Sequence, residues 1–151
     1  MKIHFRPTSL RLGDALTNLP TGTLTILTVT AILWLTLAPD PLPDTGMRLF
    51  PGSDKVVHAC MFGGLFFMAT LDCTAAHKKR RTTWSPAQRM RFYVITASAC
   101  TLFGGAIELL QDAMQIGRSA DWLDFVADGA GVALAVALTP WIIGRLFTGS
   151  H

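Results

Sequence analysis

The stretch Pro20–Ala38, PTGTLTILTVTAILWLTLA, contains no charged residue and decides the fold. As a helix it would be apolar on every side, so no face of it would be suited to water. A helix that crosses the hydrocarbon core of a bilayer needs about 20 mostly apolar residues. A soluble bundle of very apolar helices is the alternative, but nothing in this stretch balances its apolar surface. The sequence therefore predicts a membrane-spanning helix here.

Three further stretches have the same character, and each contains one strongly polar residue: His58, Glu108 or Asp128. The stretches are Val56–Leu71, Phe92–Leu110 and Phe125–Gly144. The first of them is short for a span, so we expect Lys55 or Asp72 at its ends to extend to the interface. The predicted fold class is an all-α integral membrane bundle of four transmembrane helices.

The composition of the whole chain indicates the same class. Half of its 151 residues are hydrophobic and 15% are charged, whereas a soluble domain carries about 25% charged residues. Cys60, Cys73 and Cys100 show neither a CxxC pair nor a Cys/His metal spacing. We interpret them as small apolar side chains within or at the ends of the spans.

Positive charge predicts the orientation, because cytoplasmic loops carry an excess of Lys and Arg. The connection HKKRRTTWSPAQRMR, residues 77–91, is strongly basic, and further basic residues lie near the two chain ends. These residues are Lys78, Lys79, Arg80, Arg81, Arg89 and Arg91, with Lys2, Arg6, Arg11 and Arg145. Four spans would bring all of them to one side, so both termini are predicted to be cytoplasmic. The basic loop lacks interleaved aromatic residues, so we expect it to meet anionic lipid and no nucleic acid.

The predicted organisation has three parts. Residues 1–19 form a cytoplasmic leader, in which SLRLGDALTNL, residues 9–19, is either an amphipathic helix on the membrane surface or irregular. Residues 20–147 form one transmembrane domain, and residues 148–151 form a tail. No cleavable signal peptide is evident, because the first apolar stretch is too long for one. The sequence therefore predicts a multi-pass membrane protein.

Polar residues recur at helical spacing at the outer ends of the last three stretches. Each set is spaced so that its members share one helix face. The sets are Asp54 with His58; Glu108, Gln111, Asp112 and Gln115; and Asp121, Asp124 and Asp128. Antiparallel helices would bring these sets to one membrane depth. The residues predicted to bind a ligand are Asp54, Lys55, His58, Glu108, Gln111, Arg118, Asp121, Asp124 and Asp128.

Only two cations, Lys55 and Arg118, accompany these acids, so the predicted pocket carries surplus negative charge unless some carboxyls are protonated. We expect Asp54 to meet Arg118, Lys55 to meet the acids of the later spans, and His58 to point toward Glu108. Structural clasps between helix ends are the alternative for single residues. The paired glycines within the spans predict close helix packing, or alternatively room for a ligand.

Four short elements of the sequence resemble those of a known protein family. DKVVHACMF (54–62), ELLQ (108–111), GRSADWLD (117–124) and DGAG (128–131) are similar to the D-K-x-x-H-x-x-x-F, E-x-x-Q, R-x-x-D-x-x-D and N-x-x-G elements of VanZ-like membrane proteins, in order. The resemblance covers roughly residues 20 to 140. Asp128 stands where the family usually has Asn, and Ala135 where it usually has Gly.

The resemblance implies a small polytopic protein of the bacterial cytoplasmic membrane. The naming member of the family is associated with low-level resistance to the glycopeptide teicoplanin, so the resemblance implies a role in antibiotic resistance or in the cell envelope. Asp128 adds a charge at the deepest point of the predicted site. That departure puts in doubt whether the pocket chemistry of the family carries over unchanged.

Two functions of different class fit the predicted pocket. The first is binding of a membrane lipid headgroup, a lipid-linked cell-wall precursor or a glycopeptide from the outer leaflet. The second is an intramembrane hydrolase or phosphatase, in which His58, Glu108 and Asp124 would be catalytic. His58, Glu108, Asp124 and Asp128 could then hold a divalent metal such as zinc or manganese. The sequence leaves the cofactor and a homo-oligomer open, and it contains no HExxH or GxSxG motif.

Overall fold

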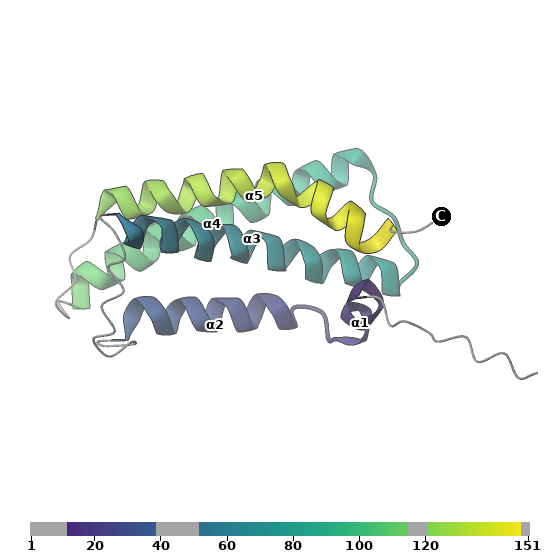
Figure 1. Ribbon diagram of the computed structural model, residues 1–151, viewed down its shortest axis with the longest axis horizontal. Helices are drawn as coiled ribbons and strands as arrows, with labels where there is room; N and C mark the ends of the chain where they lie inside the picture. The colour runs from purple at the N-terminus through teal and green to yellow at the C-terminus, as the bar shows by residue number, and fades with distance from the viewer. Residues whose placement is uncertain (1–11, 39–51, 115–120, 149–151) are drawn as a thin grey trace, which may run out of the picture.

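In a computed structural model, which describes residues 12–38, 52–114 and 121–148, the chain is built from helices (Figure 1). They are α1 (Leu12–Asn18), α2 (Thr23–Leu37), α3 (Ser53–Lys79), α4 (Pro86–Met114) and α5 (Trp122–Thr148). No strand occurs within these ranges, so the all-α prediction is confirmed for them. Helices α3, α4 and α5 are long and apolar enough to cross a membrane.

Helix α2 is shorter than the apolar stretch that predicted it. It has 15 residues, which span roughly 22 Å at the rise of an α-helix, against a hydrocarbon core of about 30 Å. The helix begins only after Gly22, whose φ of 92° lies in the left-handed region that glycine tolerates. Length and composition therefore identify three spans in the described residues, and the fourth stays a prediction.

Helix α3 is longer than its apolar stretch, because it runs for 27 residues and includes Lys55 and Asp72. The expectation that Asp72 reaches toward the interface is wrong. Its carboxylate is buried and accepts hydrogen bonds from the Thr25 N–H at 2.8 Å, the Thr25 hydroxyl at 2.7 Å and the Leu24 N–H at 3.4 Å. The first N–H groups of a helix have no partner within the helix, and Asp72 supplies one for α2.

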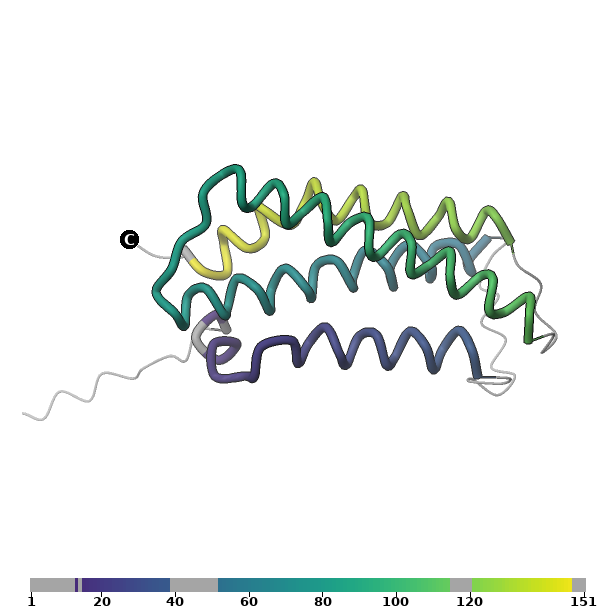
Figure 2. Tube along the Cα trace, turned by 180° about the vertical axis from the view of Figure 1, so that it is seen from behind, coloured from purple at the N-terminus to yellow at the C-terminus, as the bar shows by residue number. Residues whose placement is uncertain are grey.

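The four longer helices alternate in direction along the chain (Figures 1 and 2). As a result, the described parts of the molecule have two distinct ends. At one end, named here the acidic end, α2 and α4 finish while α3 and α5 begin. At the other, named the basic end, residues 80–85 connect α3 to α4 beside α1 and the last turns of α5.

Helix α3 lies at the centre of the bundle and contacts all of the other helices. Its most intimate partner is α5, because glycine brings the two backbones together. A Cβ atom at Gly63 would lie 2.7 Å from the Gly131 carbonyl oxygen, and one at Gly131 would collide with the Ala59 carbonyl. The predicted packing role of these glycines is therefore confirmed. The fully buried rings of Phe62 and Phe66 fill the core beside this contact.

The outer surface of the bundle is apolar along its length. Large apolar side chains on α2, α4 and α5 are each more than half exposed; they include Ile26, Leu102, Leu109, Leu134 and Trp141. Water would penalise such a surface, whereas lipid chains would not. At the basic end, Lys78 lies over the Phe147 ring and Arg145 over the Trp141 ring. The surface and the charges are those of a membrane bundle.

The predicted leader contains one described element, α1, which lies within residues 9–19. It packs against α3 and α5, and a Cβ atom at Gly13 would lie 2.9 Å from the Leu146 carbonyl oxygen. Residues 1–11 and 149–151 lie outside the described part of the chain, so the cytoplasmic position of both termini stays a prediction.

Candidate functional site

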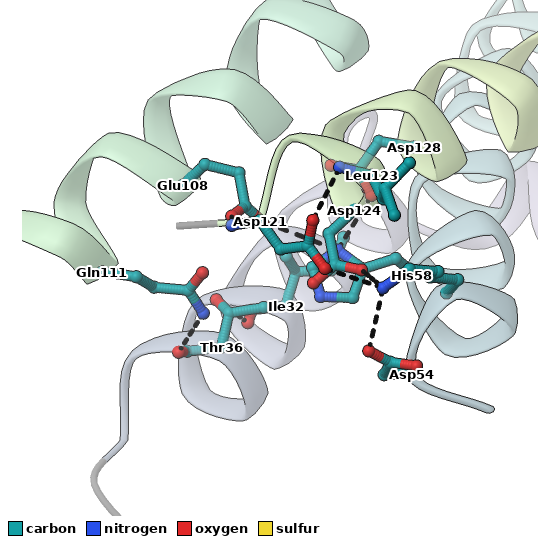
Figure 3. A network of polar contacts seen from close by, with 11 residues as sticks. Ile32, Thr36, Asp54, His58, Glu108, Gln111, Asp121, Leu123, Asp124 and Asp128 are labelled. Carbon is teal, nitrogen blue, oxygen red and sulfur yellow. Dashed lines mark hydrogen bonds and ion pairs between the residues drawn. The ribbon is translucent and has the colours of Figure 1, made fainter. Parts of the chain in front are cut away.

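The acidic end gathers the polar residues that the sequence placed on three helices. Its side chains come from the first turns of α3, the last turns of α4 and the first turns of α5 (Figure 3). They form two layers, one near the helix ends and one about a turn further in. Arg118 belongs to the predicted site but lies outside the described residues, so its expected contact with Asp54 is not described.

The outer layer is centred on Lys55. Its ammonium nitrogen lies 2.9 Å from Asp121 Oδ2, 3.0 Å from Asp124 Oδ1 and 3.2 Å from Asp54 Oδ2. The expectation that Lys55 meets the acids of the later spans is therefore confirmed for the last span; within the described residues Lys55 forms no ion pair with an acid of α4. This network joins the beginning of α3 to the beginning of α5.

Asp121 has a second task at the start of α5. Its Oδ1 accepts the Leu123 N–H at 2.9 Å, which is the contact of a helix N-cap. The hydrogen bond from Lys55 and this backbone contact hold the pKa of Asp121 below its ordinary value. Asp121 is therefore an ionised clasp between two helices.

The inner layer consists of His58, Glu108 and Asp128, named here the inner cluster. All three are largely buried, with exposed fractions of 9%, 6% and 0% respectively. His58 Nδ1 lies 3.0 Å from Asp128 Oδ1 and 3.9 Å from Glu108 Oε1. The expectation that His58 points toward Glu108 holds only in part, because Asp128 is the nearer carboxylate.

A glycine on α4 makes room for this arrangement. A Cβ atom at Gly104 would collide with the Asp128 carboxylate. Gly104 therefore lets the Asp128 side chain lie between α4 and α5, where it meets His58 of α3. One turn along α4, Glu108 reaches the same point. The sequence predicted helix packing or ligand access for Gly104. In the structure, its missing side chain leaves the space that the Asp128 carboxylate fills.

Glu108 joins the two layers. Its Oε2 accepts the backbone N–H of Asp121 at 3.0 Å, which fixes the carboxylate at the junction of α4 and α5. Its other oxygen, Oε1, and Oδ2 of Asp128 are buried and have no hydrogen-bond partner among the described residues. A buried polar atom left without a partner costs about 1–3 kcal/mol. The inner cluster therefore has capacity for a proton, a cation or a donor group of a ligand.

Gln111 is not part of either layer. Its Nε2 donates to the Thr36 carbonyl oxygen at 2.8 Å and so satisfies one of the last carbonyls of α2. Asp112 is exposed. The predicted polar face of α4 therefore does not point in one direction. Gln111 and Asp112, three and four positions after Glu108, lie on opposite sides of Glu108 around the helix axis. Glu108 faces α3 and α5, while Gln111 faces α2.

Among the residues that the structure describes, two groups have donor atoms close enough to hold a metal ion, namely the inner cluster and Asp54 with Asp121 and Asp124. In each group the atoms lie within 4.8 Å of one another. Asp124 pairs with Lys55, so the metal-ligand set predicted from the sequence loses Asp124 and retains the other three.

Two contributors were not found from the sequence. Thr36 enters through its backbone carbonyl, which no side-chain pattern reveals. Gly104 enters through the absence of a side chain, and its sequence signal was shared by every other glycine pair. Asp72 was noticed as a span-end residue, but its role in capping α2 depends on a contact between helices.

No family model matches the chain, and no curated protein or solved structure matches it either. The resemblance to VanZ-like proteins therefore stays a prediction.

Proposed function

We propose that the chain is a VanZ-like, multi-pass protein of the bacterial cytoplasmic membrane that binds the polar headgroup of an envelope lipid at its acidic end. In this proposal α2 and its flanking apolar residues supply the fourth span. Both termini are cytoplasmic, and the acidic end faces the periplasm or the cell exterior. The ligand is a membrane lipid or a lipid-linked cell-wall precursor.

The observation that carries the proposal is the pair of unpartnered carboxylate oxygens, Glu108 Oε1 and Asp128 Oδ2. They lie roughly one to two turns inside the ends of α4 and α5, at the depth where headgroups meet lipid chains. An ammonium or hydroxyl group of a headgroup would give each oxygen a donor. Charge-assisted hydrogen bonds of this kind are about twice as strong as neutral ones.

The apolar flanks of the bundle support a lipid as ligand. Leu109 and Leu110 of α4 and Trp122, Leu123 and Val126 of α5 are exposed around the cluster. Acyl chains can lie against these side chains while the headgroup reaches the carboxylates. If the resemblance to VanZ-like proteins holds, binding of a cell-wall precursor in this way would alter how teicoplanin reaches its target.

Retention of lipid by the purified chain tests the proposal. Native mass spectrometry of the protein released from detergent should show bound phospholipid or lipid-linked precursor. Glu108→Gln and Asp128→Asn should weaken retention about tenfold or more, because each removes a charge-assisted contact. Asp112→Asn is the matched control, since it removes an exposed carboxylate from α4. Equal retention by all four proteins would refute headgroup binding at this site.

A hydrolase acting on an envelope lipid is the second candidate, and the buried His58–Asp128 contact favours it. A carboxylate that orients an imidazole is a common arrangement for a general base. In this candidate Asp128, whose Oδ1 lies 3.0 Å from His58 Nδ1, would orient the imidazole in place of Asp124. Release of phosphate or of a cleaved headgroup from lipid substrates, lost in His58→Gln, would support this candidate over simple binding.

A further inference from the structure

We infer that the inner cluster of His58, Glu108 and Asp128 is a binding site for a divalent transition-metal ion, Zn²⁺ or Mn²⁺. This site does not depend on headgroup binding; it uses the same two unpartnered oxygens, so an ion and a headgroup donor are alternative partners for them. One imidazole and two carboxylates form a donor set that suits these ions. Each of the three helices α3, α4 and α5 supplies one donor, so that a bound ion would also fasten the acidic end of the bundle.

The spacing of the donors fits a single ion. Ligands held at about 2.1 Å from an ion in tetrahedral geometry lie roughly 3.4 Å apart. His58 Nδ1 lies 3.0 Å from Asp128 Oδ1 and 3.9 Å from Glu108 Oε1, on either side of that value. The three donors lie within 4.8 Å of one another, so small side-chain rotations bring them around one centre.

The unpartnered oxygens point to a ligand at this place, independently of the spacing. Glu108 and Asp128 are more than nine-tenths buried, and each has one carboxylate oxygen without a hydrogen-bond partner in the described part of the chain. Asp128 Oδ1 lies 3.0 Å from His58 Nδ1, a contact that a bound ion would replace, while Glu108 Oε2 is committed to the Asp121 N–H. A metal ligand is commonly oriented by such a second contact. Glu108 is therefore held with one oxygen fixed and the other free to coordinate.

Lys55, the cation of the outer layer, does not pair with the carboxylates of the inner cluster. Lys55 is bound by Asp54, Asp121 and Asp124, and no ion pair between Lys55 and the inner cluster occurs in the described residues. The three acids around Lys55 are the other group with metal-ligand spacing, but the ammonium nitrogen lies within 3.2 Å of an oxygen of each. That group has its cation, whereas the inner cluster takes one from solution.

A metal titration of the full chain in detergent tests the inference. After treatment with a chelator, the protein is titrated with Mn²⁺, followed by the paramagnetic resonance signal of free ion, and with Zn²⁺, followed by calorimetry. We expect one ion per chain and a rise in melting temperature on binding. Asp128→Asn and Glu108→Gln should lower the affinity at least tenfold, while Asp112→Asn leaves it unchanged.

Each of the other results overturns the inference. The first is no metal binding by the wild-type chain, and the second is equal metal affinity in Asp128→Asn. The third is an affinity that falls in Asp124→Asn but not in Asp128→Asn, because that result would place the ion at the outer acids. If Asp128→Asn cannot be purified, His58→Gln provides the same comparison from another helix. Because the titration contains no lipid, metal binding without lipid retention would refute headgroup binding alone. Lipid retention in the presence of chelator, without any metal binding, would refute the metal site alone.

Discussion

At the scale of single residues, the acidic end depends on a few side chains that each make two contacts. Glu108 accepts the Asp121 N–H and lies 3.9 Å from His58. Asp121 caps α5 and binds Lys55. Gly104 contributes by leaving space for Asp128. Because the contacts are shared, a change at one residue should alter its neighbours in the other layer.

Gly104→Ala should displace the Asp128 carboxylate, since the added methyl group would collide with it. Overpacking of this kind costs about 1–3 kcal/mol, and the His58–Asp128 contact should be lost with it. Thermal unfolding in detergent measures the cost. Gly64→Ala is the control, because a Cβ atom there would meet nothing within 4 Å. A Gly104→Ala protein as stable as Gly64→Ala would contradict this account of the site.

The stability difference between the wild-type chain and Asp121→Asn should depend on pH, because the variant removes the charge of the Asp121 carboxylate. The pKa of Asp121 is lowered from its ordinary value of 3.8, first by the hydrogen bond from Lys55. A lowered pKa stabilises the folded chain above the ordinary value, and this contribution disappears as the pH falls through the lowered pKa. Asn also caps helices well, so the variant removes mainly the charge.

The difference in melting temperature between wild type and Asp121→Asn should therefore be constant from neutral pH down to 3.8 and vanish only below it. A difference that already disappears near neutral pH would show that the Lys55 contact does not hold the carboxylate ionised.

At the scale of elements, two contacts determine how the helices meet. The close approach of Gly63 and Gly131 sets α3 against α5. At the other end of the bundle, Asp72 of α3 caps α2. The first contact brings His58 and Asp128 within reach of each other, and the second fastens the short helix whose last turn receives Gln111.

Asp72→Ala should loosen the start of α2, because it removes the acceptor of the Leu24 and Thr25 N–H groups. Loss of a cap costs about 0.5–2 kcal/mol. Hydrogen exchange should become faster at these two amides and remain unchanged in the middle of α3. Asp112→Ala, which removes an exposed carboxylate, should leave both regions unchanged. Unchanged exchange at Thr25 in the Asp72→Ala protein would show that α2 does not depend on this contact.

At the scale of the whole molecule, the bundle separates its charges. Carboxylates gather where α3 and α5 begin, and Lys and Arg gather between α3 and α4. Between these ends the surface is apolar. This distribution is the basis of the proposed orientation, in which the basic end is cytoplasmic.

Cysteine labelling tests that orientation in intact cells. In a background with Cys60, Cys73 and Cys100 replaced, a cysteine at Asp112 should react with a maleimide that cannot cross the membrane. One at Lys79 should react only after the membrane is permeabilised. Both positions are exposed, so accessibility to the reagent depends on the side of the membrane. The opposite pattern would invert the topology and place the inner cluster toward the cytoplasm.

Much of the fold could be predicted because its causes are local. Apolar stretches mark α3, α4 and α5, although the helices extend beyond the stretches into polar residues such as Lys55. Helix α2 is shorter than the sequence predicted, because Gly22 and the cap from Asp72 determine where it begins. In the site, the meeting of Lys55 with Asp124 followed from charge. The preference of His58 for Asp128 did not, because it depends on the space that Gly104 leaves.

The sequence by itself determined the helical class, the apolar surface, the segregation of charge, and the helix faces that carry acids. Periodicity along one chain segment is sufficient for these properties. Only the tertiary structure decided which acids share Lys55, which two face His58, and that Gln111 faces α2 instead of the site. The reason is that the rotation and offset of one helix against another depend on side-chain volume at the contact. A Cβ atom at Gly63, Gly104 or Gly131 would collide with a neighbouring helix or its side chain, so these glycines set how closely the helices and the charged groups on them approach.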